Sequence, residues 1–241
     1  MKAVIFDLDD TLYDQIQPFK KALDRHLQVD DELVGPLYLA FRHHADQVFE
    51  AAATGKMSLK DSHIYRMKAA LADFGFQVSD ALALTIQIDY DYFQGQLELS
   101  PMFPAIFSHC KERGLALGII TNGPHRHQLR KIRTLGLLEW FDQDLILISG
   151  QLGVAKPNPQ IFKVMEQRLG LSSDEICYVG DSFENDVIGA KACGWQAIWF
   201  NHRLRSAPET SVSPDKIVDK WEDLKEAIFP DGLAFIYGGD R

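Results

Sequence analysis

Short, continuous apolar runs recur along this 241-residue chain and constrain its fold more than any other feature. Each run is about the length of a strand and rich in Val, Ile and Leu; the runs lie at 3–6, 115–120, 145–148, 176–179 and 197–200. Such runs are typical of strands buried on both faces, as in a parallel sheet covered by helices. The segments between the later runs start with Pro or directly follow Ser, and each stops before Gly, as helices do; they lie at 101–113, 124–135, 159–169 and 183–193. This alternation predicts an α/β fold with a doubly wound, mainly parallel sheet.

One long interval, from residue 12 to residue 100, interrupts the alternation and contains no convincing buried strand. Apolar residues recur there at spacings of three and four, which predicts helices. These helices lie at 36–53, 59–74 and 79–94. We therefore divide the chain into a core domain, residues 1–14 and 98–241, and an inserted helical domain, residues 15–97. We expect the insertion to cap the edge of the sheet; the alternative is a helical domain with no part in catalysis.

The sequence beyond residue 201 is less informative about function. Residues 202–214 are polar and indicate a loop, and Ile217 with Val218 indicates a short edge strand. A closing helix is expected over 221–229. The final FIYGGDR sequence indicates a loose terminus in which Phe235 is expected to pack.

Polar residues follow several of the predicted strands, at the point where each strand ends. The first strand leads into Asp7 and Asp9, and the second leads into Thr121. The fourth leads into Asp181, and Lys156 lies in the joint after the third. In open α/β sheets, ligands bind beyond the carboxyl ends of the strands. Order and spacing alone therefore place two carboxylates, a hydroxyl, a lysine and a further acid at one rim of the sheet.

The spacing of Asp7 and Asp9 has a physical consequence. Side chains two residues apart on a strand point to the same side, so both carboxylates can face one substrate while Leu8 faces the core. Two close carboxylates repel each other and require a cation or a shared proton. Oxygen ligands favour a hard divalent cation, for which we expect Mg²⁺, with Asp181 completing the ligands. Asp, Thr, Lys and Mg²⁺ together suit phosphoryl transfer, in which negative charge develops on the equatorial oxygens.

At this point the sequence resembles the haloacid dehalogenase-like (HAD) hydrolase superfamily, from residue 2 to about residue 200. Four short motifs carry the resemblance: DLDDT at 7–11, TNG at 121–123, Lys156 before PNP, and GDSFEND at 180–186. One such motif alone is weak, but four in the correct order, each at a predicted strand end, are specific. The resemblance implies a Rossmann-like core with a C1-type helical cap inserted between the first and second motifs.

The resemblance also implies roles for the residues around a transferred phosphoryl group. Asp7 would be the nucleophile and form an aspartyl-phosphate. Asp9 would protonate the leaving oxygen and then deprotonate the attacking water. Thr121, with Asn122 and Gly123 and nearby backbone N–H groups, would bind the phosphoryl oxygens, helped by the dipole of the helix that follows.

Other motif residues are implied to hold the metal ion and to balance the charges around it. Asp181 would bind Mg²⁺ together with Asp7 and the backbone carbonyl of Asp9. Lys156 would contact the substrate and neutralise charge between Asp7 and the phosphate. Asp186 would support this arrangement, either through a metal-bound water or by orienting Lys156.

Neighbouring polar residues have simpler interpretations. Thr11 is implied to brace the first loop. Asp10 and Glu184 receive no role, because Asp10 is expected to point away from Asp7 and Glu184 has no compelling position. Taken singly, an Asp at a strand end is more often a cap, TNG a turn and Lys156 a surface charge. Only the joint pattern overturns these simpler interpretations.

Composition and the remaining motifs argue against several other classes. A net charge of −9 disfavours a nucleic-acid binder with a broad basic face. Neither histidine pair, at 43 and 44 or at 125 and 127, shares a helix face, so we expect surface or capping roles and no zinc site. The three cysteines form no CxxC pair, which indicates reduced thiols. No signal peptide or membrane span is recognisable, and we expect a cytoplasmic protein without a membrane partner.

A Mg²⁺-dependent phosphomonoesterase acting on a small phosphorylated metabolite is the leading hypothesis. TNG followed by Gln128 and by RTLGL at 133–137 resembles the branch of 5′-nucleotidases and N-acylneuraminate-9-phosphatases. This implies a nucleoside monophosphate or a sugar phosphate as substrate. A phosphomutase shares every motif and stays an alternative. A 2-haloacid dehalogenase fits less well because it needs neither Asp9 nor Mg²⁺, and a non-enzymatic regulator would tolerate loss of Asp7 or Asp9.

Overall fold

The chain forms two compact units in the computed structural model, which describes residues 1–230. The first unit comprises Met1–Asp14 and the chain from Glu98 onward, and the second comprises Gln15–Leu97. The expected packing of Phe235 lies outside the described residues. Within residues 1–230, none of the helices combines the length and the apolar character that crossing a bilayer requires.

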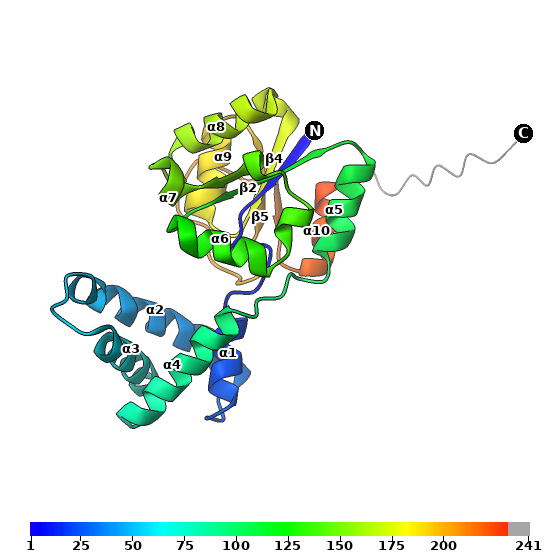
Figure 1. Ribbon diagram of the computed structural model, residues 1–241. Coiled ribbons are helices and arrows are strands. Elements are labelled where there is room, and N and C mark those ends of the chain that lie inside the picture. The colour runs from blue at the N-terminus through cyan, green and yellow to red at the C-terminus, as the bar shows by residue number, and fades with distance from the viewer. Residues whose placement is uncertain (231–241) are drawn as a thin grey trace, which may run out of the picture. The chain divides into compact units, whose positions relative to one another are not determined.

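The first unit is built on a six-stranded sheet in which every pairing is parallel (Figure 1). The strands are β1 (Ala3–Phe6), β2 (Ala116–Thr121), β3 (Ile146–Ile148), β4 (Ile176–Gly180), β5 (Gln196–Phe200) and β6 (Lys216–Val218). Their order is β3-β2-β1-β4-β5-β6, so the direction of winding reverses between β1 and β4. The predicted doubly wound parallel sheet is confirmed, and the short strand expected at residues 217 and 218 forms its edge.

Apolar side chains cover both faces of this sheet. Ile5 belongs to one buried cluster together with Met165. The next residue, Phe6, lies edge-on to the rings of Phe103 and Phe107, with ring centroids 5.7 and 5.6 Å away. Successive residues of a strand point to opposite faces, which explains why a strand buried on both faces requires a continuous apolar run.

Helices flank the sheet in the first unit (Figure 1). They are α5 (Phe103–Glu112), α6 (His125–Thr134), α7 (Ser149–Leu152), α8 (Pro159–Leu169), α9 (Ile188–Ala192) and α10 (Leu224–Ile228). The segment predicted as one helix over 183–193 begins instead with a π-helical turn, Phe183–Val187, before α9. Such wide turns are frequent at functional sites. The predicted closing helix over 221–229 likewise starts with a 3₁₀ turn, Trp221–Asp223.

The second unit contains four helices in its described part. They are α1 (Gln17–Asp24), α2 (Asp31–Ala53), α3 (Leu59–Asp73) and α4 (Asp80–Gln94). Serine caps start two of them, because Ser58 accepts a hydrogen bond from the N–H of Asp61 and Ser79 from that of Leu82. This unit has a buried core of its own, in which the ring centroid of Phe19 lies 5.0 Å from that of Phe41.

Two features of this unit differ from the sequence prediction. The interval was predicted to be mostly helical, but no separate helix was assigned at α1, whose apolar stripe is only two turns long. The start of α2 was expected at Pro36, since proline favours the first turn of a helix. The helix begins at Asp31 instead, and Pro36 lies inside it. The loss of one backbone hydrogen bond at Pro36 is tolerated because its neighbours Val34 and Leu37 are buried.

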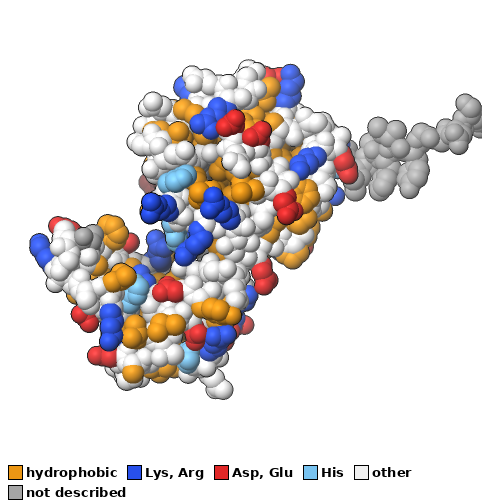
Figure 2. All heavy atoms as spheres, viewed as in Figure 1, with side chains coloured by type: hydrophobic (Ala, Val, Ile, Leu, Met, Phe, Trp, Pro, Cys, Tyr) orange, Lys and Arg blue, Asp and Glu red, His pale blue; other side chains and the backbone are white. Residues whose placement is uncertain are grey.

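The surface of the second unit keeps several large apolar side chains exposed. Leu39 and Phe49 on α2 and Ile88 on α4 are more than half exposed. Figure 2 shows hydrophobic side chains on this unit interspersed with acidic and basic ones. Such scattered apolar residues are ordinary for a protein surface.

Candidate active site

The carboxyl ends of three neighbouring strands, β2, β1 and β4, bring predicted site residues together. Thr121 is the last residue of β2, Asp7 directly follows β1, and Asp181 directly follows β4. The backbone N–H of Asp7 donates to the carbonyl oxygen of Val179 at 2.9 Å. The hydrogen bonding between β1 and β4 therefore continues into the first residue of the loop. The hydroxyl of Thr11 makes a long hydrogen bond of 3.4 Å to Asp7 Oδ2. This is the point where the strand order reverses and where open α/β sheets form their ligand crevice.

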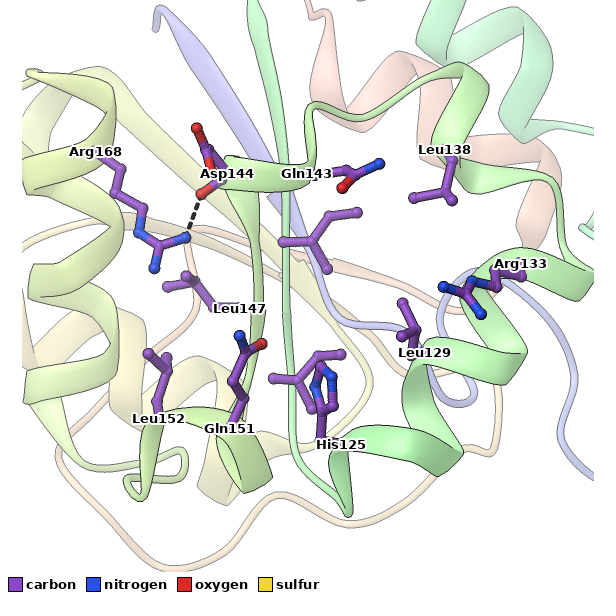
Figure 3. Close-up of a pocket in the computed structure, with 12 residues that line it drawn as sticks. His125, Leu129, Arg133, Leu138, Gln143, Asp144, Leu147, Gln151, Leu152 and Arg168 are labelled. Atoms are coloured by element: carbon purple, nitrogen blue, oxygen red, sulfur yellow. Dashed lines mark hydrogen bonds between the residues drawn. The ribbon is translucent and has the colours of Figure 1, made fainter.

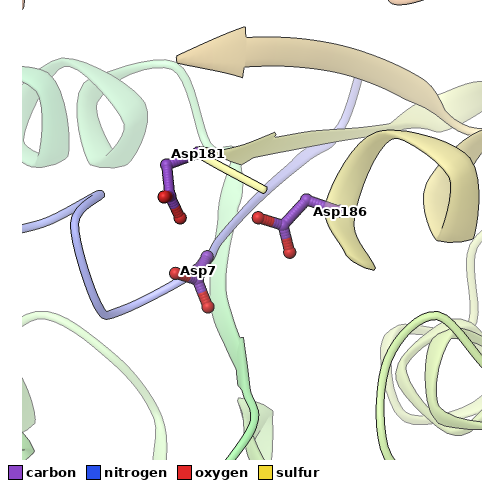
Figure 4. Close-up of side chains that lie close together, drawn as sticks. All are labelled: Asp7, Asp181 and Asp186. Atoms are coloured by element: carbon purple, nitrogen blue, oxygen red, sulfur yellow. The ribbon is translucent and has the colours of Figure 1, made fainter. Parts of the chain in front are cut away.

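Three buried carboxylates, Asp7, Asp181 and Asp186, form an acidic cluster. One oxygen of each lies within 4.8 Å of the others, and Figure 4 shows the three side chains directed toward one another. Asp186 is held on the π-helical turn, where its Oδ2 accepts the N–H of Ser182 at 2.9 Å. A Cβ at Gly180 would lie only 2.3 Å from Asp186 Oδ2, so the strand end needs glycine to admit this carboxylate.

The electrostatics of the acidic cluster favour a bound cation. Burial raises the pKa of Asp7 to about 7, with repulsion from Asp186 and Asp9 adding to the increase and Lys156 opposing it. Burial likewise raises the pKa of Asp181 to about 8, and the charges of Asp7 and Asp186 add to it. Buried oxygen ligands that repel one another are the donor set that a hard divalent cation prefers. The residues present therefore fit Mg²⁺.

Lys156 lies at the centre of the buried charges. Its Nζ donates to Asp7 Oδ1 and to Asp186 Oδ1, each at 2.6 Å. Burial opposes the charged form, but the two carboxylates raise the pKa of Lys156 well above its usual value. The Lys156 Nζ also donates to the hydroxyl of Tyr178 at 2.9 Å, and that hydroxyl donates to the carbonyl oxygen of Ile120. Tyr178 could not be recognised as a site residue from the sequence, because its only signal is a polar group inside an apolar strand.

Asp9 is held by a different set of partners from those of Asp7. Lys131 Nζ donates to its Oδ1 at 2.6 Å, Gln128 Nε2 donates to its Oδ2 at 2.9 Å, and the hydroxyl of Tyr13 also donates to it. Burial pushes the pKa of Asp9 upward, but the charge of Lys131 and these hydrogen bonds outweigh it and lower the pKa. Gln128 also donates to Thr121 Oγ1 at 2.6 Å and so links Asp9 to the end of β2. Lys131 received no role from the sequence, although residues 128 and 131 share one face of α6.

Asn122 and Gly123, predicted to bind the substrate, contact neighbouring parts of the chain. The Asn122 side chain makes two hydrogen bonds of 2.9 Å with the backbone of Lys156, one to its carbonyl oxygen and one from its N–H. The N–H of Gly123 donates to Ser149 Oγ at the start of α7, at 2.9 Å. Both residues therefore fix the loops that carry Thr121 and Lys156. The side chain of Asn122 and the N–H of Gly123 are occupied by these contacts.

Asp10, which received no role from the sequence, is buried, with 1% of its surface exposed. It has a left-handed backbone with φ of 59°, a conformation that Asp tolerates better than most residues. Its Oδ1 accepts a hydrogen bond from Arg203 Nη2 at 2.8 Å. Arg203 lies in the segment that sequence analysis treated as a polar loop, and no local pattern indicates that it reaches Asp10.

A separate cavity of about 380 Å³ lies beside β3 and α6 (Figure 3). Arg133 and Arg168 lie on its walls together with leucine side chains. His125, expected to be a surface or capping residue, also lines this cavity. Its Nδ1 is buried and, within residues 1–230, has no hydrogen-bond partner. None of the predicted site residues lines this cavity, so it is distinct from the candidate active site.

Comparison with known proteins gives a family and several named relatives. The model of the haloacid dehalogenase-like hydrolases matches residues 1–194. A glyceraldehyde 3-phosphate phosphatase of Methanothermobacter thermautotrophicus is 29% identical over 232 residues, which cover 95% of this chain and 100% of that enzyme. A phosphoserine phosphatase of Thermus thermophilus is 35% identical over 136 residues, or 55% of this chain, and this match spans only about half of that enzyme, 52%. The pyrimidine 5′-nucleotidase YjjG of Escherichia coli is 34% identical over 46% of this chain and 49% of its own length.

Solved structures share the fold at lower identity. The HAD-hydrolase YfnB of Bacillus subtilis superimposes with a TM-score of 0.64 and 22% identity, over 95% of this chain and 98% of that one. A dehalogenase superimposes with a TM-score of 0.67 and 18% identity, over 93% and 95% of the two chains. At these identities the likeness concerns the fold alone.

Proposed function

Because the chain belongs to the haloacid dehalogenase-like hydrolase family, we propose that it is a Mg²⁺-dependent phosphomonoesterase that works through an aspartyl-phosphate. The observation that carries the proposal is the acidic cluster at the strand ends, with Lys156 Nζ 2.6 Å from both Asp7 and Asp186. Relatives named as phosphatases and as a nucleotidase support the same reaction class. The proposed substrate is a small phosphorylated metabolite, either a nucleoside monophosphate or a sugar phosphate.

The proposed reaction has two displacements at phosphorus. In the first, a carboxylate oxygen of Asp7 attacks the phosphorus, the bond to the leaving oxygen breaks, and that oxygen takes a proton from Asp9. In the second, water attacks the phosphorus of the aspartyl-phosphate and gives its proton to Asp9. The bond between phosphorus and Asp7 then breaks, which releases inorganic phosphate and restores both side chains.

The pairing of Asp9 with Lys131 sets a requirement on the first step. A carboxylate 2.6 Å from an ammonium group and with a lowered pKa is ionised at rest. It is ready to accept a proton from water, but before it can act as an acid it must first take up a proton from solvent. We therefore propose that the contact between Lys131 and Asp9 opens when substrate binds.

Asp7 and Asp181 would hold Mg²⁺, with Asp186 beside them and the backbone carbonyl of Asp9 as a further proposed ligand. When bound, the ion would neutralise charge on the phosphoryl oxygens during transfer. Lys156 adds positive charge next to Asp7 from the protein side. Thr121 would bind a phosphoryl oxygen, and Asn122 and Gly123 would keep this loop in position.

The helical unit, residues 15–97, is proposed to act as a cap that excludes water from the reacting phosphorus. A 2-haloacid dehalogenase is the less favoured of the two alternatives within the family. The presence of a carboxylate at Asp9 favours the phosphatase, because an acid at this position is useful where an oxygen leaving group must be protonated. A phosphomutase would use the same residues and return the phosphoryl group to a sugar.

A panel of phosphomonoesters tests the proposal. Release of inorganic phosphate would be measured from p-nitrophenyl phosphate, nucleoside monophosphates, sugar phosphates and phosphoserine, with Mg²⁺ and with EDTA. We expect Mg²⁺-dependent release that Asp7→Asn lowers by roughly 10³-fold or more, as removal of a nucleophile does. Exposed Lys163→Gln serves as the matched control and keeps wild-type rates. Undiminished release by Asp7→Asn, or halide release from 2-chloropropionate without Mg²⁺, would overturn the proposal.

A further inference from the structure

The loop that follows β5 is a tightly built turn rather than a loose connection. Its residues, Asn201 to Arg205, are joined at both ends by the Asn201 side chain. Asn201 Oδ1 accepts the N–H of Arg205 at 2.8 Å, and Asn201 Nδ2 donates to the carbonyl oxygen of Arg205 at 2.8 Å. Leu204 takes a left-handed backbone with φ of 52° and donates its N–H to the carbonyl oxygen of Asn201. The position of the Arg205 backbone is therefore fixed by the turn.

Two further side chains attach this turn to the loop after β1. His202 Nε2 lies 2.9 Å from the carbonyl oxygen of Asp10. The Arg203 guanidinium pairs with the carboxylates of Asp10 and Asp14. Both contacts lie within the first unit, so the turn is anchored on the same loop that carries the proposed nucleophile.

Arg205 points from this anchored turn to the acidic cluster. Its Nη1 lies 3.0 Å from Asp181 Oδ2, and its Nη2 lies 3.6 Å from Asp10 Oδ2. Within residues 1–230, Arg205 is the one basic side chain in salt-bridge contact with Asp181. A carboxylate has two oxygens, and a guanidinium on Oδ2 leaves Oδ1 for another partner. Figure 4 shows that the carboxyl group of Asp181 is directed toward Asp7.

We propose that Arg205 is a positioning residue for the divalent cation: its guanidinium holds one oxygen of Asp181 so that the other faces Asp7 and Asp186. This inference rests on the proposed metal site. Partners that orient a metal ligand from behind commonly change metal affinity by about 10–100-fold when they are removed. The arginine side chain is 44% exposed, so its removal leaves no cavity in the core.

Direct binding of Mn²⁺ to the full chain tests this inference. Free Mn²⁺ would be measured by electron paramagnetic resonance at pH 8 in wild type, Arg205→Gln, Arg205→Lys and Arg130→Gln. Arg130 is exposed on α6 and serves as the matched control. We expect Arg205→Gln to raise the Kd for Mn²⁺ by about 10–100-fold, Arg205→Lys to recover part of the affinity, and Arg130→Gln to match wild type. In turnover, the Mg²⁺ activation constant should rise by more than kcat falls.

The outcomes separate this inference from the proposed function. An unchanged Kd in Arg205→Gln would overturn it, and so would a lower Kd, which would mean that Arg205 competes with the cation for Asp181. If wild type bound no Mn²⁺, the metal site itself and this inference would both fail. Arg205-dependent Mn²⁺ binding without phosphate release from any substrate would uphold the inference and refute the phosphatase.

Discussion

Replacing Lys156 with methionine tests how the buried charges are balanced. The substitution keeps most of the side-chain volume but removes the cation that lies 2.6 Å from both Asp7 and Asp186. Removing one partner of a buried ion pair costs about 3–5 kcal/mol of unfolding free energy, because the remaining charge is left uncompensated. With a urea slope of about 3 kcal/mol/M, the unfolding midpoint should fall by about 1–1.7 M.

The cost of Lys156→Met should depend on pH. The pKa of Asp7 is already raised to about 7 by burial, and loss of Lys156 raises it further. The folded variant therefore binds more protons than folded wild type, while the unfolded chains differ little. Stability falls with rising pH when the folded state holds the extra protons. The deficit relative to wild type should thus be larger at pH 8 than at pH 6.

The assay is urea unfolding followed by tryptophan fluorescence, in EDTA, at both pH values. Lys163→Met on the exposed face of α8 is the control, and a surface change of this kind should stay within about 0.5 kcal/mol of wild type. If Lys156→Met and the control had equal urea unfolding midpoints at pH 6 and at pH 8, Lys156 would not balance the charges of Asp7 and Asp186, and this reasoning would be refuted.

Three further predictions concern the residues around the acidic cluster. Burial raises the pKa of Asp7 to about 7 and that of Asp181 to about 8, so the metal-free protein loses stability as the pH rises through these values. Mg²⁺ should therefore raise the Tm more at pH 8 than at pH 6. Equal Tm shifts at the two pH values would count against Asp7 and Asp181 as ligands. Gly180→Ala should displace Asp186, lower the free energy of unfolding in urea by about 1–3 kcal/mol and weaken Mn²⁺ binding. The control is Gly35→Ala, where an added Cβ meets nothing within 4 Å, and it should not destabilise the protein. Lys131→Met should raise the pKa of Asp9 in the free enzyme and move the corresponding limb of the pH profile of kcat/KM, which reports the free enzyme, to higher pH; an unmoved kcat/KM profile would remove Asp9 from that role.

Much of the sheet could be predicted because its physical signal is local. A strand buried on both faces must be apolar at consecutive positions, as Ile5 and Phe6 are, and that requirement is visible in a single sequence. The acids at strand ends were predictable for a related reason. The carboxyl ends of parallel strands meet at one edge, so Asp7 and Asp181 converge once the strands are placed.

The contacts that complete the site were not predictable because they join residues far apart in sequence. Lys131 reaches Asp9 across the first unit, and Arg205 reaches Asp181 only because the turn after β5 is folded back. Lys131 and Arg205 each lie in a segment with several charged residues, so nothing local distinguishes them from their neighbours. Tyr178 was unpredictable for another reason. A tyrosine in a buried strand is common, and only the structure shows that Lys156 donates to its hydroxyl.

Helix boundaries were less predictable than helix existence. Proline 36 indicates a helix start by its intrinsic preference, but burial of the residues around it extends α2 back to Asp31. The π-helical turn, Phe183–Val187, has a tertiary cause as well, since it carries Asp186 to Lys156. Local preferences do not report such long-range contacts.

Trapping the covalent intermediate would decide whether Asp7 is the attacking group. The full chain would be mixed with a phosphomonoester and Mg²⁺, quenched in acid, and reduced with borohydride, which converts an aspartyl-phosphate to homoserine. Tandem mass spectrometry would then read residue 7. The proposed mechanism predicts homoserine at position 7 in turning-over enzyme and unaltered aspartate without substrate. Unaltered aspartate at position 7 in both samples, with the enzyme demonstrably releasing phosphate, would contradict it.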